Sequence, residues 1–344
     1  MAVLEAKDII DILNGAQAEL GRGSFEDISQ ETQRLEVFSK WFKKDMVKFA
    51  SGNQIQRNLL NNQDDEAGFV GILDPDSANI PNVLAQLQVP WRHYRTKWAM
   101  EYRTDMLMNS GAAEIVDTVK LHRTSALLNL AKVLETKAWS APSATNKTDP
   151  YGVPYWIVRD TVTGFNGGYP AGHTSIGGID TDTSPNFKNY TAQYVNLTKE
   201  DAITKMRVAH REIQFMSPID IPTYRSNVGN PYRVYVNQDS ITEIESTGEG
   251  QNENLGRDIA PYDGENMTFR RHPIIWISQL DSDTNDPIYL INTRVFHPVC
   301  LKGDHLRETE PRQAPNNVNV YETYVFGSFN FICIDRRANA LIAK

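Results

Sequence analysis

The alternation of apolar and polar residues divides the chain into a few long elements separated by polar, glycine-rich stretches. The strongest helical pattern covers 111–139, and its apolar positions are Val116, Val119, Ala126, Leu130 and Leu134. A helix of about 29 residues is about 43 Å long, which is long for a globular protein. A second helix is predicted from Thr198 to Pro218, with an apolar side formed by Ile203, Met206, His210 and Ile213.

Residues 93–104 alternate between two kinds of side chain, which predicts an amphipathic strand. One face carries Tyr94, Thr96, Trp98, Met100 and Tyr102, and the other carries His93, Arg95, Lys97, Glu101 and Arg103. Cations and aromatic rings on opposite faces cannot bind one nucleic-acid strand together, so a stacking platform is the weaker interpretation. We expect an interface strand whose candidate contacts are His93, Arg95, Lys97, Trp98, Glu101, Tyr102 and Arg103.

The rest of the chain combines short strands with irregular segments. Residues 1–20 form an amphipathic segment, and 50–88 form an unusually long polar loop. Residues 140–190 are rich in Gly, Asn and Thr, which indicates loops. Strands are expected at 233–236, 274–277, 288–291 and 319–334. Two helices among many strands predict an α+β fold.

Composition narrows the class of protein. The chain has 344 residues, 40% of them hydrophobic, and a net charge of −8, so it is globular and lacks the cationic surplus of proteins that coat nucleic acid. Lys120, Arg123 and Lys132 on the long helix still fit either a non-specific nucleic-acid contact or an ordinary solvated face. No apolar run predicts a membrane span or a signal peptide. Cys300 and Cys333 lie in apolar strands and are expected to be buried thiols.

Motifs for catalysis and metal binding are missing from the sequence. We find no HExxH pair, GxSxG elbow, phosphate-binding loop or dinucleotide fingerprint. We therefore predict no catalytic residue, cofactor or metal site. Residues 281–286 begin like a calcium loop but lack the required glycine and the final glutamate. A polar hairpin turn is the favoured interpretation there, and a calcium loop is the alternative.

The order of these elements, together with three stretches, resembles one protein family. The stretches are Val89-Pro90-Trp91-Arg92-His93, Asp149 to Val158, and Cys333-Ile334-Asp335-Arg336-Arg337. They are similar to major capsid proteins of tailed bacteriophages with the Hong Kong 97-type (HK97-like) fold, and the resemblance covers nearly the whole chain. It implies an N-terminal arm at 1–48, an extended loop at 49–105, and a peripheral domain at 106–218 with the spine helix at 111–139. It also implies an axial domain at 219–305 and peripheral return strands at 306–344.

The resemblance also implies a function. The chain would be a structural shell subunit, and not an enzyme, that self-assembles into pentamers and hexamers of an icosahedral phage head enclosing double-stranded DNA. Its partners would be other copies of itself, with scaffold, portal and decoration proteins as further candidates and non-specific contact with packaged DNA. It would be made in the host bacterial cytoplasm and end in the virion.

Two alternatives remain open. One is an encapsulin-like nanocompartment shell, which encloses protein cargo. The other is a soluble β-rich enzyme or glycan-binding protein. The long polar loop at 50–88 favours a shell, because an enzyme is expected to gather polar residues in a pocket.

Overall fold

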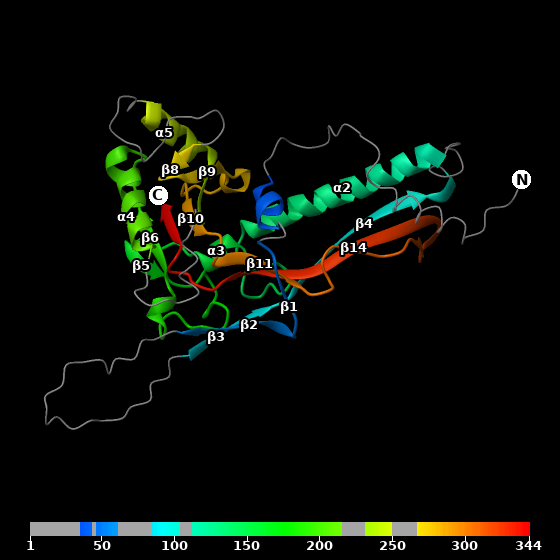
Figure 1. Cartoon of the computed structure of the whole chain (residues 1–344), viewed down its shortest axis with the longest axis horizontal. Coiled ribbons are helices and arrows are strands. Elements are labelled where there is room, and N and C mark those ends of the chain that lie inside the picture. The colour runs from blue at the N-terminus through cyan, green and yellow to red at the C-terminus, as the bar shows by residue number, and fades with distance from the viewer. Residues whose placement is uncertain (1–34, 43–45, 61–83, 104–111, 215–230, 250–266) are drawn as a thin grey trace, which may run out of the picture.

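The computed structural model describes residues 35–42, 46–60, 84–103, 112–214, 231–249 and 267–344. Figure 1 shows an elongated molecule in which helix α2 (Ala112–Ala138) lies along two long strands, β4 (Arg92–Glu101) and β14 (Asn317–Cys333). Shorter helices and strands form a compact part at one end of these strands (Figure 1). The predicted segment at 1–20 and the middle of the predicted loop, 61–83, lie outside the described residues.

The first sheet is organised around β14, which pairs along most of its length. It runs antiparallel to β4 from Val320↔Glu101 to Phe329↔Arg92, and antiparallel to β11 beyond that. The other strands of this sheet are β1 (Lys48–Ala50), β11 (Phe296–Leu301), β12 (Arg307–Glu308) and β13 (Arg312–Ala314). The predicted strand at 319–334 is therefore confirmed.

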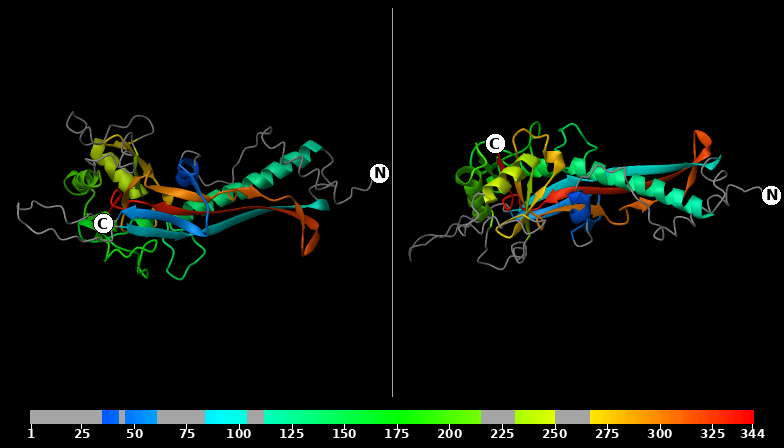
Figure 2. Two further views of the ribbon diagram at one scale, coloured as in Figure 1. Left: turned by 60° about the horizontal axis from the view of Figure 1, so that its bottom comes forward. Right: turned by 90° about the horizontal axis from the view of Figure 1, so that it is seen from above.

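Helix α2 covers one face of the β4–β14 pair, as both views in Figure 2 show. Val119, Leu130 and Leu134 are buried on it, as the helical pattern predicts. The Thr96 hydroxyl of β4 donates to the Ala126 carbonyl of α2 at 3.3 Å. The predicted helix at 111–139 is confirmed to within a residue at each end.

The second sheet has seven strands in the order β5-β6-β15-β10-β7-β9-β8. Their bounds are β5 Gly164–Gly167, β6 Asn189–Gln193, β7 Tyr232–Val236, β8 Thr268–Phe269, β9 His272–Trp276, β10 Ile288–Asn292 and β15 Ala340–Ala343. Three of these strands confirm the predictions at 233–236, 274–277 and 288–291.

Two helices lie beside this sheet: α4 (Thr204–Glu212), which follows a π-helical turn at Lys199–Ile203, and α5 (Gln238–Glu249). The apolar side predicted for α4 is buried: Ile203, Met206, His210 and Ile213 are all at most 5% exposed. The His210 and His272 imidazoles meet there, with their Nε2 atoms 2.8 Å apart.

Residues 140–190 contain little regular structure, as predicted. They form only α3 (Val153–Trp156), β5, a 3-10 turn at Pro185–Phe187 and the start of β6. The hairpin turn predicted at 281–286 is wrong. This segment follows a 3-10 turn at Ser278–Leu280 and joins β9 to β10, and both strands pair with β7 rather than with each other. It is therefore a crossover connection.

The hairpin formed by β2 (Gln54–Leu60) and β3 (Leu84–Pro90) is separate from both sheets. It docks on the loop at Gly177, whose carbonyl accepts a hydrogen bond from the Gln88 amide at 2.7 Å. Gly177 has φ +56°, and a Cβ at this position would overlap the Leu87 side chain. A glycine is therefore needed there for the close approach of the hairpin.

The largest apolar core joins the two sheets around Trp41. Trp41 belongs to a π-helical turn at Val37–Trp41 and donates from Nε1 to the Tyr235 hydroxyl at 3.0 Å. Its ring packs against Phe296 and Trp139, with centroid distances of 5.2 and 5.6 Å. The segment around Trp41 is therefore an integral part of the core.

Buried polar groups complete this core. The Glu135 carboxylate of α2 is fully buried and accepts from the Val37 amide and the Trp139 indole, at 2.7 and 3.0 Å. Cys300 and Cys333 are buried free thiols, as predicted, and burial raises the pKa of Cys300 to about 12. No helix among the described residues is long and apolar enough to cross a bilayer.

Candidate assembly surface

Strand β4 has the two faces that its sequence predicts. Trp98 and Met100 are 4% and 2% exposed on the face toward α2. The side chains of the opposite face are exposed to solvent: His93, Arg95, Lys97, Glu101 and, just beyond the strand, Arg103. The alternation is thus confirmed, because one face of the strand is covered by the helix and the other is not.

Strand β14 contributes aromatic and acidic side chains to the same exposed face. In the antiparallel register Arg95 is paired with Phe326, Lys97 with Tyr324 and Ala99 with Glu322, and paired residues of neighbouring strands point to the same side. The face away from α2 therefore combines cations and aromatic rings from two different strands. A single strand considered alone could not reveal this arrangement.

The charges of this face are partly paired within the subunit. Lys97 Nζ lies 3.0 Å from Glu322 Oε1. The hydrogen bond and charge of Glu322 raise the pKa of Lys97, and hydrogen bonds from Tyr324 and Lys97 lower the pKa of Glu322. The counter-charge of Lys97 therefore comes from Glu322, in a segment about 225 residues away in the chain.

Two arginines from short strands extend the exposed face. Arg307 of β12 lies over the Phe326 ring at 4.3 Å, and Arg312 of β13 lies over the Tyr324 ring at 5.3 Å. An open groove beside them has a volume of about 560 Å³ and is lined by Arg307, Glu308, Thr309, Glu310, Pro311, Arg312 and Phe326. We call Arg95, Lys97, Arg307, Arg312, Glu322, Tyr324 and Phe326 the ribbon face.

The remaining predicted contact residues differ in their accessibility. Trp98 is buried within the subunit, and its indole Nε1 donates to Glu308 at 3.4 Å. Tyr102 is half-buried. His93 is exposed, and its Nδ1 lies 2.7 Å from the Ser328 hydroxyl. The accessible part of the predicted set is therefore its charged residues, while Trp98 stabilises the subunit itself.

The long helix is also partly engaged within the subunit. Arg123 Nε lies 3.0 Å from Glu308 Oε1, and Lys120 is 7% exposed. Lys132 is exposed. Of the three cations that the sequence places on this helix, only Lys132 has an exposed side chain.

Arg336 is a buried residue whose role the sequence did not reveal. Its side chain is 0% exposed and donates to five acceptors in the irregular region 150–190. These are the carbonyls of Trp156, Phe187, Gly167 and Gly168 and Oδ1 of Asn189, at 2.6, 2.7, 3.0, 2.7 and 2.9 Å. Burial lowers its pKa to about 10. The only hint in the sequence is the glycine-rich segment itself, because its main-chain carbonyls need hydrogen-bond donors when they are buried.

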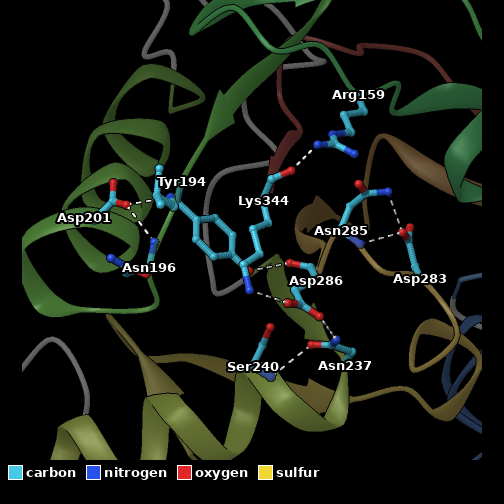
Figure 3. A network of polar contacts seen from close by, with 11 residues as sticks. Arg159, Tyr194, Asn196, Asp201, Asn237, Ser240, Asp283, Asn285, Asp286 and Lys344 are labelled. Atoms are coloured by element: carbon cyan, nitrogen blue, oxygen red, sulfur yellow. Dashed lines mark hydrogen bonds and ion pairs between the residues drawn. The ribbon is translucent and has the colours of Figure 1, made fainter.

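The crossover at 281–286 forms a polar network with other segments (Figure 3). The Tyr194 hydroxyl donates to the Asp286 carbonyl at 2.7 Å, and Asn237 Nδ2 donates to Asp286 Oδ1 at the same distance. Asp281 accepts from the Gln238 amide at 2.7 Å. These carboxylates hold the start of α5, and within the described part of the chain no His, Cys, Asp and Glu side chains gather as metal ligands do.

One serine lies between a histidine and an aspartate, but the arrangement is not that of a nucleophile. The Ser328 hydroxyl donates to Asp304 Oδ2 and lies beside His93 Nδ1, and the serine is 2% exposed. The hydroxyl is buried and already engaged by the Asp304 carboxylate, whereas an activated nucleophile is accessible and hydrogen-bonded to its base. The group fixes the loop before β12 to β4 and β14.

Comparison with known proteins is informative at the level of structure. No protein-family model and no curated protein matches the sequence. The capsid asymmetric unit of cyanophage A-1(L) is similar over 94% of this chain and 96% of its own, with a TM-score of 0.64 and 13% identity. The chain has the HK97-like capsid fold.

Two further structures agree over almost the whole length. The capsid of the native GTA particle covers 95% of each chain with a TM-score of 0.57 and 10% identity. The capsid of Myoviridae phage XM1 covers 99% of each chain with a TM-score of 0.52 and 10% identity. The HK97-like capsid fold expected from the sequence is therefore confirmed, and it includes the mixture of helices and strands that defines the α+β class.

Proposed function

We propose that this chain is the major capsid protein of a tailed bacteriophage. It assembles as pentamers and hexamers into an icosahedral head that encloses double-stranded DNA. The observation that carries the proposal is structural. Capsid subunits match this chain over nearly its whole length, although their sequences are only 10–13% identical to it. A shell role needs matching surfaces between copies, and the exposed charged face of β4 offers one such surface.

The proposal assigns a role to each segment of the chain. Residues 1–48 are the N-terminal arm, whose last part is anchored in the core by Trp41. The extended loop, 49–105, includes the β2–β3 hairpin and β4. The peripheral domain comprises 106–218, with α2 as the spine helix, and the return strands of 306–344. The axial domain is 219–305 and contributes β7 to β11.

The proposed contact surface between copies is the charged face of β4. His93, Arg95, Lys97, Glu101 and Arg103 are exposed there, and Arg307 and Arg312 enlarge the cationic area. Carboxylates of an adjacent copy are the complementary groups, because the whole chain has a net charge of −8. Each exposed ion pair contributes about 0–1 kcal/mol, but the contact recurs in every copy of the shell.

Further partners follow from the same proposal: scaffold, portal and decoration proteins, and packaged DNA bound without sequence preference. Assembly takes place in the host cytoplasm, and the product is the virion. The test is electron microscopy of the expressed full-length protein. Closed shells support the proposal if they contain nucleic acid when the protein is produced during phage infection. Shells filled with a protein cargo support a nanocompartment instead.

A further inference from the structure

Two cations and a histidine outside the ribbon face lie close together and have no carboxylate partner among the described residues. Lys48 is on β1, Arg57 on β2 and His297 on β11. Among the described residues, no carboxylate pairs with Lys48 or Arg57, and the only side-chain hydrogen bond of Arg57 goes to the neighbouring Gln56 carbonyl at 3.1 Å. Lys97 and Lys137, by contrast, have acidic partners in Glu322 and Asp149.

Strand register places two of these residues on one side of the first sheet. Lys48 is paired with Val299 in the parallel β1–β11 ladder, and His297 precedes Val299 by two residues. The side chains of Lys48, Val299 and His297 therefore lie on the same face. Asn330, which is paired with Val299, also belongs to this face and donates to the Pro90 carbonyl at 2.8 Å. The face is thus the one turned toward the β2–β3 hairpin.

Arg57 approaches the same place from the hairpin. It is paired with Leu87, which is 1% exposed and packed on the body of the subunit. Paired side chains share one side of the hairpin, so Arg57 also points toward the body. Lys48 is exposed and Arg57 half-buried, so an anion from solvent or from another molecule can reach both.

His297 adds an independent sign of a missing partner. Its side chain is 2% exposed, and neither ring nitrogen has a hydrogen bond of normal geometry, although a main-chain group of Arg294 lies close. A buried polar group without a partner is destabilising, and such groups are rare enough to need an explanation. The imidazole lies beside the charges of Lys48 and Arg57, so a carboxylate bound by these two cations neutralises them and offsets their repulsion of a protonated imidazole.

The structure also shows where such a carboxylate is available. Helix α5 exposes Asp239, Glu243 and Glu245 and carries no basic residue, and none of these acids forms an ion pair with another described residue. Figure 1 shows α5 at the opposite side of the compact part from β1 and β2, so α5 of the same chain cannot reach the cluster. The chain therefore carries complementary surfaces that only different copies can bring together.

We propose that Lys48, Arg57 and His297 form an anion-binding cluster that receives a carboxylate from a second copy of this chain. The inference rests on the proposed shell function and adds a specific contact to it. The contact is electrostatic and local, so it is distinct from burial of the aromatic face of β4.

Zero-length cross-linking tests the contact directly. A carbodiimide joins Lys48 Nζ to a carboxylate only where the two are in ion-pair contact. Full-length protein labelled with ¹⁵N is mixed with unlabelled protein, associated at low salt, cross-linked, digested and analysed by mass spectrometry. We expect a mixed-isotope peptide pair that contains Lys48 and an acidic residue, and its loss in Lys48→Arg, whose guanidinium does not react.

Charge reversal measures the contribution of the same contact. Lys48→Glu with Arg57→Glu is expected to weaken association roughly ten-fold or more at low salt. Lys199→Glu with Lys302→Glu changes the net charge equally at exposed positions and is expected to have less than a three-fold effect. Melting temperatures of the unassociated proteins show that the variants are folded.

The possible results separate the cluster proposal from the proposed shell function. Association detected by sedimentation, with Lys48 joined only to acids of its own chain or to none, contradicts the cluster proposal while leaving the shell function intact. Loss of DNA binding without loss of association in the Lys48→Glu/Arg57→Glu protein also contradicts it, in favour of a nucleic-acid partner. A protein that never associates contradicts both proposals.

Discussion

The guanidinium of Arg336 donates a hydrogen bond to Oδ1 of Asn189 at 2.9 Å, although 147 residues separate the two in the chain. The same Asn189 amide donates from Nδ2 to the Val158 carbonyl at 2.9 Å. Together the two side chains supply donors to the main chain of a region that has little sheet or helix of its own. Arg336, which follows β14, and Asn189 therefore both stabilise residues 150–190.

Arg336→Met is expected to lower the free energy of unfolding by about 3–5 kcal/mol, because it leaves several buried acceptors without donors. Arg337→Met is the matched control, since Arg337 is exposed and has one side-chain hydrogen bond, to Asn186 at 3.0 Å. We expect the control to cost less than about 1 kcal/mol. Chemical denaturation of the unassembled subunit measures both, and equal effects would contradict the role assigned to Arg336.

Leu130→Asp tests whether α2 stabilises the subunit itself. Leu130 is 4% exposed on the side of α2 that faces the sheet, whereas Val133 on the same helix is 50% exposed. An unpaired carboxylate at Leu130 is expected to cost about 3–5 kcal/mol, and Val133→Asp less than about 1 kcal/mol. If Leu130→Asp left the melting temperature unchanged and blocked only assembly, the buried stripe would have to face another molecule.

The charged face of β4 makes a prediction about assembly. Arg95→Glu with Lys97→Glu places one acid beside Glu322 and a second acid opposite Phe326 on the same face. We therefore expect assembly to slow or stop while the melting temperature stays within a few degrees. Raising the salt concentration should weaken assembly of the native protein through screening. Light scattering at several salt concentrations measures both effects. Normal assembly of the double variant at low salt would show that this face is not a contact.

His297 predicts how stability depends on pH. Burial, together with the charges of Lys48 and Arg57, lowers the pKa of His297 from 6.5 to about 4. Between these values the unfolded chain binds more protons, so the free energy of unfolding falls as the pH falls from 6.5 to 4, by about 3 kcal/mol for this group. The His297→Leu protein should lose that much less stability over this range. Parallel pH profiles of the two unassembled subunits would contradict the assignment.

The sequence predicted the elements whose patterns are local. The stripe of Val119, Leu130 and Leu134 and the alternation around Trp98 and Met100 each repeat within one segment, and the structure confirms both. The crossover at 281–286 was misassigned, because a turn-rich segment between two strands does not reveal that β7 lies between them.

The candidate surface could be predicted only in part, for a related reason. The exposed charges of β4 follow from its own alternation, but Glu322, Tyr324 and Phe326 join them through the register of β14. Arg336 could not be recognised, since a charged residue near a strand end usually lies in solvent. Pairing between distant segments decides both cases, and a single sequence does not show it.

The central claim is that many copies of this chain close into one shell, and cryo-electron microscopy of the purified full-length protein tests it most directly. The protein is incubated at low salt, with and without a co-expressed scaffold. The account predicts closed icosahedral particles built from pentamers and hexamers, in which α2 lies along β4 and β14 within each subunit. A protein that stays monomeric under every assembly condition, with the scaffold supplied, would contradict the account.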